Sequence, residues 1–162
     1  MIIMTKRWSF FLALVFFLPM SGCIGMPPTD TLIGQDRSIL IAQWGEPRNE
    51  QTQDLLTHLE YHRGIQTFIF SLNTNQRIES WEQVLDEAHF AKIHPGMSTF
   101  EVSWLIGQPD QKSQTGFTNS HIWSYRDQNA LSFCRWFEIE FSALGRVKSR
   151  GYDYLPYCKS QL

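Results

Sequence analysis

A helix-stop signal that occurs twice constrains the fold of this 162-residue chain more than any other feature. The segments AQWGEP, residues 42–47, and WLIGQP, residues 104–109, both end in Gly-x-Pro, 62 positions apart. A glycine just past the last turn suits the backbone of a helix cap, and a proline soon after it cannot continue the helix. Both segments therefore predict the end of a short helix, and they raise the question of whether the flanking sequence repeats as well.

The residues before each stop predict a helix with a defined start. In the second copy, Ser98 can cap the helix while Glu101 reaches back to it, which is the capping-box pattern. In the first copy, Asp36 keeps the cap but Ile39 replaces the glutamate. The apolar stripe of the second helix is formed by Val102, Leu105 and Ile106.

The residues after each stop predict strands in the same order. In both copies a polar loop leads into three strand-like segments, of which residues 135–142 show the clearest alternation of apolar and acidic positions. The segments are residues 58–62, 67–73 and 74–81 in the first copy, and residues 121–126, 135–142 and 143–152 in the second. The chain is therefore predicted to contain an internal duplication of one helix and three strands.

This duplication predicts an α+β fold. We expect one antiparallel sheet of about six strands, in which each half is a meander and the short helices pack on one face. Residues 31–162 are expected to form a single pseudo-duplicated domain, with a first module at 31–85 and a second at 86–162.

The start of the chain predicts export. Lys6 and Arg7 precede an uncharged apolar run at residues 8–20, which is too short to span a bilayer and is typical of a secretory signal peptide. We therefore assign residues 1–22 to a signal peptide. No later segment approaches the length of apolar sequence that a transmembrane helix needs.

The segment MSGC, residues 20–23, resembles the lipobox of bacterial lipoproteins, which implies a lipid on Cys23. Ile24 follows the cysteine instead of the aspartate that retains lipoproteins in the inner membrane, so the resemblance implies sorting to the outer membrane. Residues 23–30 would then be a lipidated tether, and the acyl chains would anchor the protein. An ordinary signal peptide with a chance cysteine is the alternative.

The charge of the mature chain argues against nucleic acid as a partner. Removal of residues 1–22 leaves 12 of the 14 basic residues against 16 acidic residues, a net charge of −4. Nucleic-acid binding depends on a basic surface that releases counterions.

The cysteines predict one disulfide. If Cys23 carries lipid, Cys134 and Cys158 remain in an oxidising compartment, and they flank one predicted hairpin. A catalytic thiol is the alternative, but Cys134 lies in the strand-like segment SFCRWF and not at a helix N-terminus, where a thiolate is favoured.

No motif in the chain predicts catalysis. The five histidines lack the spacing of a metal site and are expected at the surface or at helix caps, and no nucleophile or phosphate-binding motif is present. We therefore expect neither an enzyme nor a metal or cofactor, but a binding protein. Aromatic and arginine side chains are the usual anchors of protein contacts. The candidates are Trp81, Trp123, Arg135, Trp136 and Tyr154, with the alternative that they fill the core.

The motifs of the second copy resemble those of the SmpA/OmlA family of BamE-like outer-membrane lipoproteins. The resemblance covers residues 95–152 well and residues 33–85 more loosely, and Ile106 stands where the family has leucine. The doubled layout is also similar to the tandem-repeat fold of β-lactamase inhibitor proteins. The matching elements are Gly96-Met97-Ser98, Glu101-Val102, Ile106-Gly107-Gln108-Pro109, Trp123-Ser124-Tyr125 and Gly145-Arg146-Val147.

The resemblance implies a lipid-anchored outer-membrane lipoprotein that faces the periplasm of a Gram-negative bacterium. It implies a non-catalytic accessory factor in envelope biogenesis, with the β-barrel assembly machinery as the expected protein partner. The alternative is a periplasmic protein-binding inhibitor or sensor of the β-lactamase-inhibitor type.

We predict that the exported protein has no free thiol, because Cys134 and Cys158 are paired. Closing a loop of roughly 25 residues stabilises a fold by about 3 kcal/mol in the chain-entropy model. Mass analysis under non-reducing conditions checks the pairing, and two free thiols would contradict it.

Overall fold

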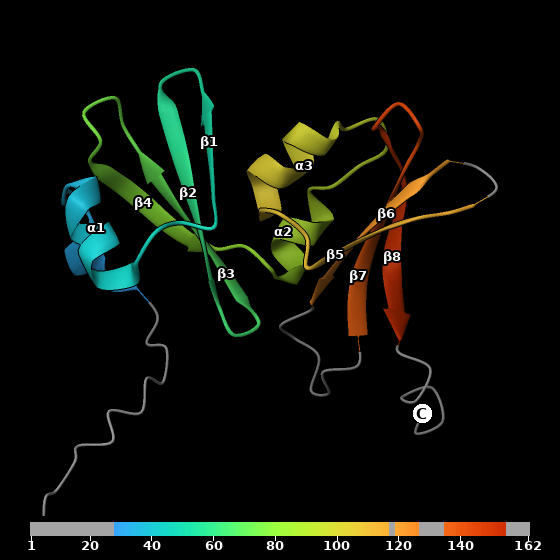
Figure 1. Ribbon diagram of the computed structural model, residues 1–162, viewed down its shortest axis with the longest axis horizontal. Coiled ribbons are helices and arrows are strands. Elements are labelled where there is room, and N and C mark those ends of the chain that lie inside the picture. The colour runs from blue at the N-terminus through green and yellow to red at the C-terminus, as the bar shows by residue number, and fades with distance from the viewer. Residues whose placement is uncertain (1–27, 117–118, 127–134, 155–162) are drawn as a thin grey trace, which may run out of the picture.

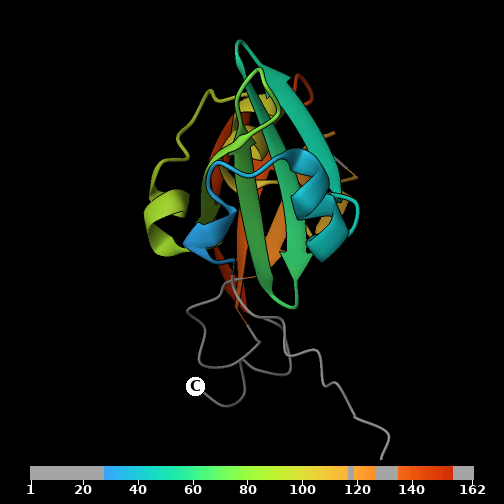
Figure 2. The same cartoon turned by 90° about the vertical axis from the view of Figure 1, so that its left-hand side faces the viewer.

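Two four-stranded antiparallel sheets stand on either side of a helical layer in the computed structural model, which describes residues 28–116, 119–126 and 135–154 (Figure 1). A further helix, α1, covers the far side of the first sheet, as Figure 2 shows. The order of the layers is therefore α1, first sheet, helices α2 and α3, second sheet. Within the described residues, no helix is long and apolar enough to cross a membrane.

The first module begins with a short 3-10 helix, η1 (Asp30–Leu32), and α1 (Arg37–Trp44). As predicted, Asp36 caps α1 by accepting the backbone N–H of Ser38 at 2.9 Å. The chain then forms a meander in the order β1 (Asn49–Gln53), β2 (Leu56–Arg63), β3 (Gln66–Leu72) and β4 (Ile78–Gln83).

The second module repeats this order. It begins with α2 (Glu87–Ala91) and α3 (Thr99–Ile106), and the predicted capping box between Ser98 and Glu101 is confirmed. The second meander runs in the order β5 (Gln111–Gln114), β6 (His121–Arg126), β7 (Arg135–Phe141) and β8 (Val147–Tyr154).

The prediction of an α+β fold with tandem modules is confirmed, but the prediction of one six-stranded sheet is wrong. Each sheet has a fourth strand, β1 or β5, in a segment that the sequence indicated as a polar loop. Both are edge strands with little burial, and all four residues of β5 are exposed. An edge strand that buries neither face needs no apolar alternation, so the sequence pattern did not reveal it.

The predicted position of the helices on one face of a single sheet is also wrong. The α2–α3 layer contributes Phe90, Val102 and Ile106 to the core of the second sheet. Its other side contacts the first sheet, where the ring of Trp104 stacks on that of His58. The layer thus separates the two sheets and prevents them from joining edge to edge.

Each module has its own apolar core. In the first, Trp44 of α1 makes edge contacts with Tyr61, Phe68 and Phe70, with ring centroids 5.2 to 5.7 Å apart. In the second, Phe90 of α2 stacks on Phe137 at 4.1 Å. Fully burying one such side chain contributes about 1.5–3 kcal/mol, so each core can fix its helices on its own sheet.

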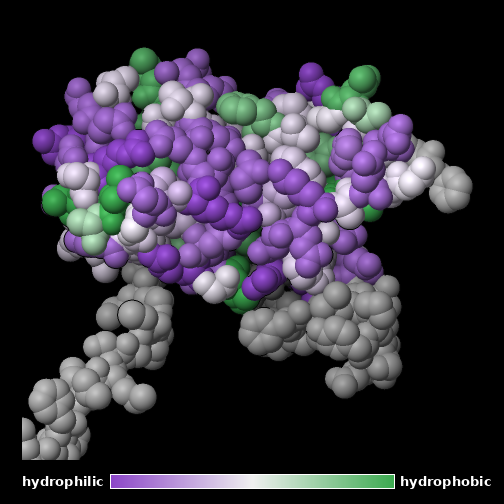
Figure 3. Space-filling model, in the orientation of Figure 1, coloured by the Kyte–Doolittle hydropathy of each residue, from purple (hydrophilic) through white to green (hydrophobic). Residues whose placement is uncertain are grey.

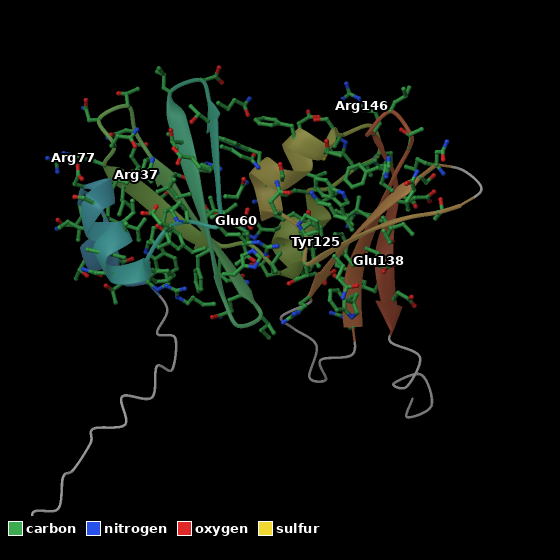
Figure 4. The ribbon with its side chains drawn as sticks, in the orientation of Figure 1. Arg37, Glu60, Arg77, Tyr125, Glu138 and Arg146 are labelled. Atoms are coloured by element: carbon green, nitrogen blue, oxygen red, sulfur yellow. The ribbon has the colours of Figure 1, made fainter. Side chains whose placement is uncertain are left out.

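Matching hydrogen bonds in the two modules confirm the duplication. Tyr61 donates to the carbonyl of Gly45 at 3.0 Å, and Tyr125 donates to that of Gly107 at 3.1 Å. An isolated β-bridge joins Asp36 to Arg77 in the first module, and the same bridge joins Ser98 to Arg146 in the second. Figure 4 labels Arg77 beside α1 and Arg146 near the turn between β7 and β8.

The helix-stop glycines share one conformation but have different surroundings. Gly45 has φ 79° and ψ −170°, and Gly107 has φ 78° and ψ −171°, so φ is positive but ψ is extended instead of left-handed. A Cβ atom at Gly107 would lie 2.9 Å from Cδ of Glu60, whereas one at Gly45 would meet nothing within 4 Å. Glycine is therefore required at Gly45 by conformation alone, and at Gly107 by conformation and contact.

We predict that Gly107→Ala destabilises the protein more than Gly45→Ala. This backbone region is nearly exclusive to glycine, and another residue there costs roughly 1–3 kcal/mol of conformational free energy. Both variants should therefore lose about this much folding stability. Gly107→Ala also displaces the Glu60 carboxylate, so its loss is larger. Urea denaturation of the two variants measures the difference, and equal losses would contradict a close contact between the modules.

Candidate functional site

Each sheet has one face on the apolar core of its own module, and we call the opposite face its outer face. The outer faces of the two sheets differ in what covers them. Glu60 pairs with Ile69 across β2 and β3, and Ser124 pairs with Glu138 across β6 and β7, so Ile69 and Glu138 are equivalent positions. Ile69 is 6% exposed beneath the α2–α3 layer, whereas Glu138 is only half-buried. Figure 4 labels Glu60 between the first sheet and the helical layer, and Glu138 on the second sheet. The first sheet is thus buried on both faces and the second on one.

A buried carboxylate holds the two modules together. Glu60 is 3% exposed, and its Oε2 accepts the backbone N–H of Gln108 at 2.9 Å. Its Oε1 lies 2.7 Å from Nε2 of His62, whose ring also contacts Arg48. Arg48 in turn donates to the carbonyl of Pro109 at 3.2 Å. Because a buried charge is costly unless it is paired and hydrogen-bonded, this network fixes the second module against the first.

One further contact crosses the same junction, and one bond within the second module holds the turn at Gly107 in place. Gln51 of β1 donates its side-chain amide to the hydroxyl of Ser103 at 2.9 Å. Burial raises the pKa of Tyr125 well above 10, and the charges of Glu60 and Asp110 add to this effect. The phenol therefore stays protonated and can donate to Gly107.

A cleft of about 150 Å³ lies beside this junction, between strands β3 and β4 and the α2–α3 layer. We call it the intermodule cleft. Its apolar lining is Ile69, Val84 and Leu105, and its polar lining includes Glu82 and Lys92.

Aromatic rings form one wall of the intermodule cleft. Trp104 stacks on His58 with ring centroids 3.6 Å apart, and Phe100 stacks on the same indole at 6.1 Å. Phe100 is 44% exposed. Figure 3 shows a hydrophobic patch at the upper edge of the molecule, over α3, on a face that is otherwise mostly hydrophilic.

The prediction that all five histidines are surface or capping residues is wrong for two of them. His58 stacks in the cleft and His62 binds the buried Glu60. Both occupy positions that alternate with core residues in β2, so the sequence pattern placed them on a solvated face. A covering layer contributed by the other module could not be read from that pattern. His89 does bind the N-cap residue Asp86, at 2.8 Å, and it also lies 3.0 Å from Glu82.

The candidate aromatic residues do not converge on one surface. Trp123 is a core residue, 8% exposed. Trp81 is half-buried against Phe68, with ring centroids 6.1 Å apart. Trp136 is half-buried on the outer face of the second sheet, where the guanidinium of Arg126 lies 6.0 Å from its ring.

The other candidates lie elsewhere or outside the described residues. Arg135 points to the opposite face of β7 from Trp136, and its guanidinium lies 4.2 Å from the ring of Tyr152. Tyr154 ends β8, but its side chain is not among those described. The predicted lipidation and disulfide sites also lie outside the described residues, at Cys23, Cys134 and Cys158.

The outer face of the second sheet is charged and partly hollow. A hollow of about 270 Å³ lies over Gly151, bordered by Glu138 and Glu140. Ser124 donates to Glu138 at 3.0 Å, and Lys148 binds Glu140 at 2.5 Å. The bond from Lys148 is the main reason that the pKa of Glu140 is lowered. We call this surface the open face, and it also includes Ile122, Arg126 and Trp136.

Neither site forms a metal centre from the described residues. Across residues 28–116, 119–126 and 135–154, no group of three or more His, Cys, Asp or Glu side chains could hold a metal ion. The arrangement is suited to contact with another molecule, through an aromatic cleft and an uncovered sheet.

Comparisons with known proteins show resemblance at the level of the fold only. No protein-family model matches the chain, and no curated protein matches it either. The chain is similar to a Streptococcus mutans protein provisionally assigned as a β-lactamase inhibitor protein, at 15% identity over 74% of this chain and 83% of that one, with a TM-score of 0.34. It is also similar to the DUF4309 family protein YjgB of Bacillus subtilis, at 12% identity over 80% and 87% of the two chains, with a TM-score of 0.30.

A third similar structure is an extracellular protein of Bacillus anthracis that contains an SCP domain. The identity is 10%, the TM-score is 0.32, and the match covers 99% of this chain but only 52% of that protein. TM-scores this low carry no argument about function. Since no family model matches, the resemblance to the SmpA/OmlA family stays a prediction from sequence motifs.

We predict that acid weakens the junction between the modules through His58. Desolvation lowers its pKa below 6.5 in the folded protein, so the unfolded chain binds a proton at higher pH than the folded one. Stability should therefore be lost as pH falls from about 6.5 towards the folded pKa. Urea midpoints measured across this range test the effect.

The variant His58→Phe keeps a ring against Trp104 but cannot titrate, so its urea midpoint should vary less with pH. His94→Gln, at an exposed position, is the control and should behave like the wild type. An unchanged pH dependence in His58→Phe would show that His58 is not the responsible group.

Proposed function

We propose that this protein is a secreted, lipid-anchored and non-catalytic binding protein that holds one protein partner on the open face of its second sheet. The observation that carries the proposal is an asymmetry within the duplication. The first sheet carries a helical layer on its outer face, and the equivalent face of the second sheet carries none in the described chain.

The chemistry of the open face favours a partner that binds reversibly. Glu138 replaces the apolar Ile69 of the first sheet, so the surface stays soluble when it is unoccupied. Interfaces of proteins that associate and separate are about as polar as the rest of the surface, and they depend on a few aromatic and arginine anchors. Trp136, Arg126 and Ile122 supply such anchors.

The anchor and the compartment complete the proposal. A lipid on Cys23 would hold the protein at a membrane, with the sequence favouring the periplasmic face of the outer membrane. We propose an inhibitor or sensor of one envelope protein as the role. The β-barrel assembly machinery is the second candidate target, favoured by the lipobox together with the SmpA/OmlA-like motifs.

We predict that a photoreactive amino acid at position 136 or 138 crosslinks one protein partner in cells. The same group at position 43, on exposed α1, serves as the control and should give no such product. Recovery of a barrel-assembly subunit would identify the second candidate target, and a soluble periplasmic protein would identify an inhibitor or sensor. The absence of any specific product from the open face would exclude the proposal.

Once the partner is identified, Trp136→Ala should weaken its binding by about 10-fold or more, the effect of losing one interface anchor. A soluble form that lacks residues 1–23 allows this affinity to be measured directly. Normal affinity in Trp136→Ala, with a normal circular dichroism spectrum, would rule out Trp136 as an anchor.

A further inference from the structure

The intermodule cleft is a second site, separate from the open face. It lies on the other side of the α2–α3 layer, where the first sheet meets Trp104 and Leu105 of α3. An inference about its ligand therefore does not depend on the function proposed for the open face.

The size of the intermodule cleft suits one small apolar group. A cavity of about 150 Å³ can hold one benzene ring. Ile69 and Val84, which are 6% and 2% exposed, and the partly buried Leu105 form its apolar surface. The indole of Trp104 stands at the side and is fixed there by its stack with His58. A branched aliphatic or aromatic side chain would gain burial on this surface without any rearrangement of the fold.

Two opposite charges border the same apolar surface. The side chain of Glu82 is 60% exposed, and one of its oxygens is held by Nε2 of His89 at 3.0 Å, so the other oxygen can accept a further bond. Lys92 is exposed and makes no ion pair within the described residues. The cleft thus offers an acceptor for N–H groups and a cation for an oxygen, next to an apolar pocket.

We propose that the intermodule cleft binds one apolar amino-acid residue. The side chain packs on Ile69, Val84 and Leu105, the amino group or amide N–H faces Glu82, and the carboxylate or carbonyl oxygen faces Lys92. Two sources share this chemistry, a free apolar amino acid and an apolar residue within a peptide chain.

The test is a titration of the soluble chain lacking residues 1–23, in which binding is monitored by the NMR signal of the Trp104 indole N–H. The probes are L-leucine, N-acetyl-L-leucinamide and L-alanine. We expect a leucine probe to shift this signal with a Kd on the order of 1 mM, and alanine to shift it far less because it buries little apolar area. Binding of leucine itself indicates a free amino acid, and binding of the capped amide alone indicates a residue in a peptide.

Three variants test the assignment of the cleft. Ser71→Phe places a ring in the cleft and should abolish the shift, whereas Glu140→Phe adds the same ring at the equivalent position of the second sheet and should leave it unchanged. Lys92→Ala should weaken the binding of L-leucine by about 2- to 5-fold, which is the effect of losing one exposed charge pair. No shift with either leucine probe, or a shift that persists in Ser71→Phe, would overturn the proposal.

Discussion

The buried carboxylate of Glu60 is the interaction on which the arrangement of the two modules depends. It accepts an N–H from the turn that follows α3 and lies beside His62, so it joins the second strand of one module to the helix end of the other. The turn can approach only because Gly107 has no side chain. A desolvated charge tolerates little displacement of its partners, and the helical layer is therefore held in one position on the first sheet.

That position leaves the molecule with two unlike ends. Repeat proteins stack so that each unit covers its neighbour, and the terminal units carry polar outer surfaces that remain soluble. The second module covers the outer face of the first sheet, and no described helix or strand covers the equivalent face of the second sheet. Glu138 stands where the first sheet has Ile69, so the uncovered face carries a charged side chain at the position where the covered face carries an apolar one.

Local patterns predicted the elements that bury one face or obey capping rules. The Ser98–Glu101 box and the alternation around Ile139 are confirmed, because each depends on neighbours within a few residues. The strands β1 and β5 were missed because edge strands need no apolar face. The intermodule cleft was missed because His58 and Trp104 contact each other only across the junction, 46 positions apart in the sequence.

The sequence by itself determined the duplication, the starts and ends of α1 and α3, the α+β class and the apolar face of each sheet, since these follow from spacing and side-chain type. It also carries the apolar N-terminal run and the cysteines on which the export, anchor and disulfide predictions rest. Only the tertiary structure decided that the sheets stay separate, that Glu60 is buried, and that one outer face is covered while its equivalent is open. These features arise where two modules meet, and a contact between distant residues leaves no periodic trace in the chain.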